Sequence, residues 1–153
     1  MSRPILYLSA LVMTAAASAA AQAHDMHFSA GAPGDPKKPA RTIVVTMKQE
    51  YGTMEYVPNR IEVKRNEQIR FVLKNVDKES HEFLLATAAD NLKHAAIMKK
   101  HPEMEHDDPN AKTVAAGAES EILWRFSKPG TFEFVCLIPG HREQGMVGSV
   151  HVK

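Results

Sequence analysis

Cysteine is nearly missing from this sequence: Cys136 is the only one among 153 residues. No disulfide can therefore form within the chain, and the fold has to be stable without such cross-links. The motif G-x-S-x-G is absent as well, which argues against a serine hydrolase of that class. No internal repeat is present, so we expect one domain rather than an array of units.

Neither sign of charge dominates, because 19 Lys and Arg residues stand against 18 Asp and Glu residues. A chain that binds nucleic acid usually carries a basic excess, so we expect no nucleic-acid partner. Mixed charges of this kind are typical of an ordinary protein surface. We also expect a monomer.

A long hydrophobic run is also missing, although residues 1–23 are apolar in part. Arg3 is followed by an apolar stretch from Ile5 to Ala17 and by the small residues Ala21-Gln22-Ala23. This pattern is typical of a secretory signal peptide, and its apolar part is too short for a membrane span. We expect a mature periplasmic chain that starts at His24 and is not inserted in the membrane. An unpaired cysteine in that oxidising compartment is either inert or bound to something other than cysteine.

The surroundings of Cys136 indicate what that partner is. Phe132 and Phe134 alternate with polar residues before it, which predicts a strand with one buried face. Pro139-Gly140 then predicts a turn, and Met146 to Val152 alternates again as a returning strand. Cys136 therefore opens a loop between two strands.

This loop has the spacing C-x4-H-x4-M, formed by Cys136, His141 and Met146. Thiolate, imidazole and thioether together favour copper, and two histidines, one cysteine and an axial methionine describe a blue-copper centre. The second histidine has to come from elsewhere in the chain. His81 is the best candidate, because it follows the strand pattern Ile69-Phe71-Leu73 and a polar break over residues 75–80.

A histidine after a hydrophobic strand, followed later by a C-x4-H-x4-M loop, resembles the cupredoxin family of small blue-copper proteins. The resemblance covers roughly Thr42 to Lys153 and is strongest over Phe132 to Val152. It implies an all-β Greek-key sandwich and one type 1 copper. The metal ligands that it implies are His81, Cys136, His141 and Met146. It also implies that the histidine of the loop lies near the surface, where electrons enter.

One position departs from the family pattern. Many cupredoxins follow the first histidine with Asn or Ser, whose side chain ties the two ligand segments together. Here Glu82 follows His81 and Ser80 precedes it. The sequence therefore leaves the group that locks the two segments unassigned.

The chain from Thr42 onward predicts seven or eight short, mostly antiparallel strands of a sandwich. One helix is expected as an insertion near residues 88–101, with Asp90 as its cap and Pro102 as its end. Residues 42–153 are thus the expected cupredoxin domain. Trp124 is expected in its core.

Residues 24–41 are rich in Gly, Pro and Ala without apolar periodicity, so we expect a flexible arm. Its first residues include the copper donors His24, Met26 and His27. They are either an auxiliary metal site or a tail that happens to contain histidine.

A second group of donors lies in and after the expected helix: His94, Met98, His101, Met104 and His106. His94 and Met98 are four residues apart and so share a helical face. The group either binds additional metal or is a solvated helix with a core-facing Met98. The segment from His94 to Asn110 is similar to the copper-tolerance subgroup of cupredoxins called CopI-like.

Two functions follow from these features. In the first, the protein is a periplasmic copper-tolerance factor that binds copper and handles or transfers it, with a redox or copper-transfer protein as partner. In the second, it is a mobile one-electron carrier between respiratory or oxidase partners. We expect no enzyme activity, because the copper oxidases of this family need paired H-x-H motifs or a second domain, and neither is present.

Overall fold

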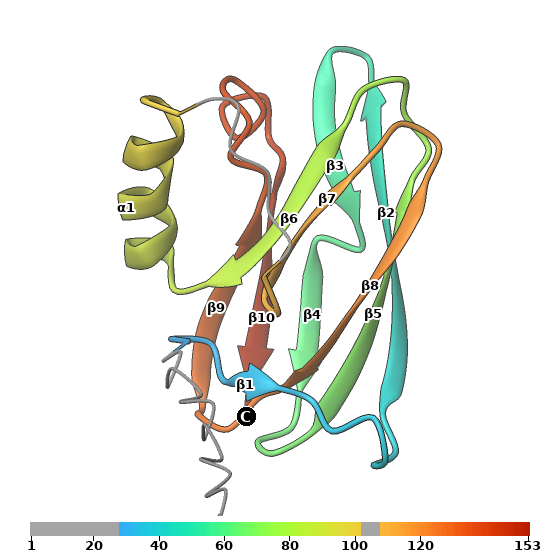
Figure 1. Cartoon of the computed structure of the whole chain (residues 1–153), viewed down its shortest axis with the longest axis vertical. Helices are drawn as coiled ribbons and strands as arrows, with labels where there is room; N and C mark the ends of the chain where they lie inside the picture. The colour runs from blue at the N-terminus through green and yellow to red at the C-terminus, as the bar shows by residue number, and fades with distance from the viewer. Residues whose placement is uncertain (1–27, 102–107) are drawn as a thin grey trace, which may run out of the picture.

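The computed structural model describes residues 28–101 and 108–153, and this part of the chain folds into two five-stranded sheets packed face to face (Figure 1). The first sheet has the order β1 (Ala32–Pro33), β8 (Glu119–Arg125), β5 (Gln68–Asn75), β2 (Arg41–Glu50) and β3 (Thr53–Val57). The second has the order β4 (Arg60–Val63), β10 (Val147–Val152), β9 (Gly130–Val135), β6 (His81–Ala86) and β7 (Ala111–Val114). Helix α1 (Ala88–Met98) follows β6 and lies beside the second sheet.

The alternation of apolar residues explains why these segments pair as they do. In β5, Ile69, Phe71 and Leu73 are fully buried, and the residues between them are partly exposed. Strand β5 pairs with β8 on one side and runs parallel to β2 on the other. A second parallel pair joins β4 to β10, and the remaining pairs of the described strands are antiparallel. The chain passes from one sheet to the other at Pro58, between the edge strands β3 and β4, as expected for proline.

Aromatic side chains fill the space between the sheets. Phe83 of β6 stacks on Phe134 of β9 with a centroid separation of 5.0 Å, and Tyr56 of β3 meets Phe134 edge to face at 5.1 Å. Gly148 of β10 makes room for this cluster, because a Cβ atom there would lie 2.2 Å from the Phe134 ring. Full burial of one such ring contributes about 1.5–3 kcal/mol. The cluster joins β6, which begins at His81, to β9, which ends just before Cys136.

The expectation of a flexible arm over residues 24–41 is wrong for its described part, residues 28–41. Strand β1 pairs with the end of β8, and Ala30 is fully buried. Phe28 packs edge to face on Trp124 at 5.3 Å, and the Trp124 indole donates a hydrogen bond to the Ala30 carbonyl at 3.1 Å. This segment has little apolar periodicity, but one ring contact, one side-chain hydrogen bond and a short strand pairing hold it in place.

The sandwich is confirmed, but the described chain has ten strands instead of seven or eight. The two additional strands are the two-residue β1 and the four-residue β7, which are too short for a periodic pattern. The inserted helix is also confirmed, and it ends at Met98. Thr87 is its N-cap, accepting from the Asp90 backbone N–H at 3.2 Å, and Asp90 accepts from the Thr87 hydroxyl. Asp90 is therefore the third helical residue, bonded to the cap through its backbone and its side chain, and not the cap itself.

Trp124 is fully buried, as expected for a core residue. Within residues 28–101 and 108–153, the structure contains no helix with the length and apolar character that crossing a bilayer requires.

Candidate metal centre

The expected metal ligands gather because three neighbouring strands of the second sheet begin or end at one point. Strand β6 begins at His81, β9 ends just before Cys136, and β10 begins just after Met146. These strands are adjacent in the order β10, β9, β6. The site therefore lies at one end of the sandwich, the upper end in Figure 1.

Three of the four expected donors meet directly. The ligand atoms of His81, Cys136 and His141 all lie within 4.8 Å of one another. The two Nδ1 atoms are 3.2 Å apart, and the Cys136 Sγ atom is 3.3 Å from the His141 Nδ1 atom. Among the His, Cys, Asp and Glu side chains that the structure describes, no other group of three converges in this way.

These separations fit a single bound metal ion. Two nitrogen ligands each about 2.0 Å from one ion, at an angle of roughly 110°, lie about 3.3 Å apart. Two imidazoles and one thiolate are also the strong donors of a blue-copper site. Met146, the expected weak axial ligand, is fully buried in the same core cluster as Cys136, and its backbone carbonyl accepts from the Cys136 N–H at 3.2 Å. The residues present therefore fit copper.

The site is dry, and this changes the acidity of its groups. His81 and Cys136 are fully buried, and His141 is 7% exposed. Burial raises the pKa of the Cys136 thiol to about 12. Burial, together with the neighbouring His81, lowers the pKa of His141 below its usual value. The lowered pKa favours the neutral imidazole of His141, which can bind a cation, whereas the thiol has to release a proton when metal binds.

The segment that carries Cys136, His141 and Met146, residues 136–146, is called here the cysteine loop. Main-chain hydrogen bonds hold it: the His141 N–H donates to the Ile138 carbonyl, and the Met146 N–H donates to the His141 carbonyl, each at 3.0 Å. The start of β3 supports it from outside, since the Met54 N–H donates to the Gln144 carbonyl at 3.0 Å. Consecutive turns, closed by main-chain hydrogen bonds, thus set the conformation of the loop.

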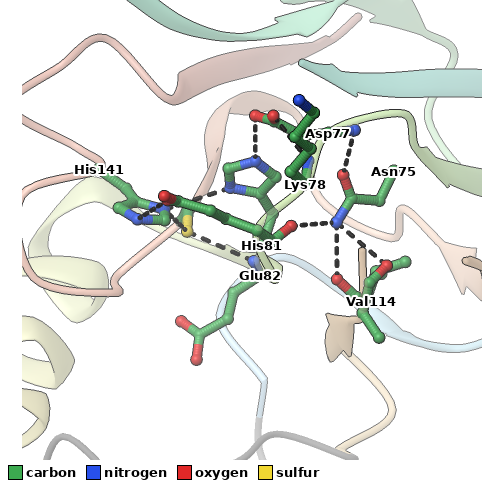
Figure 2. Close-up of polar contacts among 10 residues, drawn as sticks. Asn75, Asp77, Lys78, His81, Glu82, Val114 and His141 are labelled. Atoms are coloured by element: carbon green, nitrogen blue, oxygen red, sulfur yellow. Dashed lines mark hydrogen bonds and ion pairs between the residues drawn. The ribbon is translucent and has the colours of Figure 1, made fainter. Parts of the chain in front are cut away.

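The segment that leads to the other histidine, residues 75–81, is called here the histidine loop, and side chains hold it (Figure 2). The buried Asn75 amide donates to the carbonyls of Glu79, Val114 and Ala115 at 2.7–3.1 Å. Its Oδ1 atom accepts from the Asp77 backbone N–H at 2.9 Å. At the end of β5, where strand pairing stops, the hydrogen bonds of the Asn75 side chain hold the backbone instead.

Asp77 was not singled out in the sequence, yet it contacts His81, one of the expected ligands. Its Oδ2 atom lies 3.0 Å from the His81 Nε2 atom, on the side of the ring opposite His141 (Figure 2). Burial tends to raise the pKa of Asp77, but hydrogen bonds from His81 and from backbone N–H groups outweigh it and hold this pKa below its usual value. A carboxylate four residues before the histidine was the available signal.

Glu82 takes the place left unassigned by the sequence, since it links the two loops. Its backbone N–H donates to the Cys136 Sγ atom at 3.3 Å, and its carboxylate accepts from the Leu137 N–H at 3.2 Å. The Tyr56 hydroxyl donates to the Glu82 carbonyl. Glu82 is only 2% exposed, and burial raises the pKa of its carboxyl to about 7.

A second carboxylate supports the cysteine loop from α1 and β9. Glu133 binds the Arg142 guanidinium through two hydrogen bonds of 2.9 Å. The Asn91 amide of α1 also donates to Glu133, at 3.1 Å. This arrangement ties the loop, the strand and the helix together.

The candidate auxiliary donors are only partly described. His24, Met26, His27, Met104 and His106 lie outside the described residues. Met98 is buried in an apolar cluster with Leu84, Ala86, Ala111, Val135 and Leu137, as a core-facing residue of the helix. His101 is exposed, and His94 is half-buried. These three side chains therefore do not share one environment.

His94 lines a small pocket of about 200 Å³ together with Asp90, Asp108 and Phe28. Burial lowers the pKa of His94, and Asp108 opposes this effect. Phe28 directly follows His27 in the sequence, and Asp108 comes two residues after His106. The described ends of both donor-rich segments thus meet at His94.

Comparisons with known proteins agree with this geometry. Residues 43–153 match the family model of copper binding proteins of the plastocyanin/azurin family. The copper-resistant cuproprotein CopI of Rubrivivax gelatinosus is 50% identical over 137 residues, which cover 90% of this chain and 81% of that protein. The copper-resistant cuproprotein CopI of Pseudomonas aeruginosa is 34% identical over 181 residues, covering 99% and 98% of the two chains.

Among solved structures, auracyanin B superposes with a TM-score of 0.63 at 21% identity, covering 80% of this chain and 96% of that chain. This likeness shows the fold alone. The matched region contains both loops and all four expected ligands. The chain therefore belongs to the plastocyanin/azurin family of copper-binding proteins, the cupredoxins, with CopI cuproproteins among its relatives.

Proposed function

We propose that this protein is an exported copper-tolerance factor with one type 1 copper site. His81, Cys136 and His141 are the strong ligands, and Met146 is the weak axial ligand. The convergence of the first three donor atoms within 4.8 Å, with all three side chains buried, is the observation that carries the proposal. The names of the CopI relatives support the link to copper resistance.

Bound copper supplies a one-electron couple between Cu(I) and Cu(II), which prefer different ligand geometries. The chain's part is to hold its donors in a fixed arrangement before metal arrives. Two imidazoles enter from separate loops, and Glu82 keeps these loops at a fixed separation through Cys136 and Leu137. Such rigidity disfavours rearrangement between the two oxidation states.

The metal site is tested by adding copper to purified protein and recording the visible spectrum. We expect intense sulfur-to-copper absorption and one strongly bound copper per chain. Cys136→Ser should abolish this absorption, and His81→Gln should change it strongly. His151→Gln is the matched control, because this histidine is exposed on β10. Absorption that survives in Cys136→Ser would contradict the ligand assignment.

A second candidate function is that of a mobile electron carrier. We propose no enzyme activity for either function. The near-surface position of His141, 7% exposed beside the buried site, favours the carrier, because electrons need a short path to a partner. Deleting the gene separates the two functions. Loss of growth on copper-loaded medium with intact respiration supports copper tolerance, and respiratory failure at low copper supports the carrier.

We further propose that the two donor-rich segments, together with His94, add copper capacity. The pocket that His94 shares with Phe28 and Asp108 supports this, since Phe28 directly follows one segment and Asp108 comes two residues after His106 of the other. Anaerobic Cu(I) titration should give more than one copper per chain. The excess should fall in a variant with His24, Met26 and His27 replaced, and in one with His94, His101, Met104 and His106 replaced. Equal stoichiometry in all three proteins would contradict this role.

Export to the periplasm rests on the signal-like residues 1–23 and on the likeness to copper-resistance proteins. The intact mass of protein recovered from the periplasm should correspond to a chain that begins at His24. Protein that keeps residues 1–23 in the cytoplasmic fraction would contradict export.

A further inference from the structure

The two ligand histidines differ in what lies behind them. The His81 Nε2 atom is 3.0 Å from the Asp77 carboxylate, whose side chain is 13% exposed. The nearest carboxylate to the His141 Nε2 atom is that of Glu79, 3.9 Å away on a side chain that is 61% exposed. One histidine thus has a close, nearly buried anionic partner, and the other has only a distant, solvated one.

Asp77 is itself held in place by the main chain. Its Oδ1 atom accepts from the Lys78 N–H at 2.8 Å, and the Gln49 backbone N–H also donates to its carboxylate. Its own N–H donates to Asn75. Both main-chain groups that contact the carboxylate, the N–H groups of Lys78 and Gln49, are donors. An ionised carboxylate requires such donors.

This pattern also determines which nitrogen of His81 carries the proton. An ionised carboxylate only accepts hydrogen bonds, so the Nε2 atom of His81 has to be the donor. The Nδ1 atom, which faces His141 and Cys136, is then left with its lone pair free for a metal. A carboxylate behind a ligand histidine also makes the ligating nitrogen more basic and orients the ring.

We infer that Asp77 is a positioning residue of the metal site: it fixes His81 in the tautomer that binds metal and favours the more highly charged Cu(II) over Cu(I). This inference rests on the proposed type 1 site. The two histidines then have different roles. His81 is held by a nearby carboxylate, whereas His141 has no carboxylate of the described residues at hydrogen-bond distance and lies nearer the surface. The hydrogen bonds of the histidine loop then position the Asp77 carboxylate as well as the His81 ring.

The first test needs no metal. In the metal-free protein at pH 8, long-range 15N–1H correlation spectra should show His81 protonated on Nε2 and unprotonated on Nδ1. In Asp77→Ala the ring should populate both tautomers. A wild-type ring protonated on Nδ1, or a variant with an unchanged tautomer, would overturn the inference even if the protein bound no copper.

The second test is the reduction potential of the copper-loaded protein. Asp77→Asn keeps the shape of the side chain and removes its charge, so the ratio of Cu(II) to Cu(I) affinity should fall about tenfold, a rise of about 59 mV for one electron. Glu79→Gln is the matched control and should change this ratio less than threefold. A shift in Asp77→Asn no larger than that in the control would overturn the inference.

Discussion

The cysteine loop and the histidine loop meet at the same site, but they are stabilised by different means. Turns of the main chain close the cysteine loop, as in the bond from the Met146 N–H to the His141 carbonyl. Side chains close the histidine loop, chiefly the amide of Asn75. The first kind of loop depends on backbone conformation and tolerates many side chains. The second depends on a few residues and should fail when one of them is changed.

The largest effect on this difference between the loops is expected for Asn75→Ala. The change leaves the carbonyls of Glu79, Val114 and Ala115 without their donor in a buried place, so the free energy of unfolding should fall by roughly 3–4 kcal/mol. Urea denaturation measures it. Asn110→Ala is the control, because that amide makes one bond, to Leu85, and about 1 kcal/mol is expected. Equal losses in the two variants would show that Asn75 has no special role.

Glu82, the link between the loops, should make the stability of the metal-free protein depend on pH. The unfolded carboxyl loses its proton near pH 4.5, whereas burial keeps the folded one protonated up to about pH 7. Between these values the unfolded chain binds fewer protons, so stability falls as pH rises. The total loss is about 3 kcal/mol and is complete above pH 7.

Glu82→Gln should remove this fall, since its amide oxygen still accepts from Leu137 without titrating. Glu121→Gln is the control, because this carboxylate is paired with Arg70 on the outer face. Urea denaturation from pH 4 to pH 8 gives the comparison. The same slope in wild type and Glu82→Gln would contradict the assignment.

Gly145→Ala tests the cysteine loop, whose conformation is set by the backbone. Gly145 has φ +106°, and a Cβ atom there would lie 3.2 Å from the Met54 carbonyl oxygen. We expect a loss of about 2 kcal/mol from strain and crowding together. Gly117→Ala, at φ +70° with open space around it, should cost about 1 kcal/mol. Thermal unfolding followed by circular dichroism distinguishes the two, and a larger effect at Gly117 would contradict the argument.

The smallest effect is expected for Arg142→Ala, which removes the two bonds to Glu133. Because this pair is only partly exposed, the loss should be about 1–2 kcal/mol, compared with less than 1 kcal/mol for the exposed Arg70 in Arg70→Ala. Double-mutant cycles with Glu133→Gln and Glu121→Gln give the two pair energies. Equal pair energies would show that Glu133 does not support the loop.

The same contrast explains what the sequence could predict. The motif from Cys136 to Met146 is contiguous, and alternation placed strands on both sides of it. His81 was found because it follows the strand pattern of β5. The contacts of Glu82 were not found, because they depend on a partner brought close by folding, Leu137. Asp77 lies only four residues before His81, but the spacing alone does not show that its carboxylate reaches the ring.

The described part of the arm was mispredicted for a similar reason. Residues such as Ala32 and Pro33 carry no periodic signal, and their order comes from Trp124, far away in the sequence. Short strands with long-range partners are decided by tertiary contacts. The contacts of Trp124 explain why these residues pair, whereas their local composition predicted a flexible segment.

The burial of Cys136 has a consequence for the protein before it receives metal. The thiol has no exposed area, and burial raises its pKa to about 12, so the thiolate is a minor form at pH 7. Oxidants and other thiols react with the exposed thiolate. Burial and the raised pKa of Cys136 therefore shield the metal-free protein from covalent dimerisation and from sulfenic acid formation, and they preserve the sulfur that the proposed copper site needs.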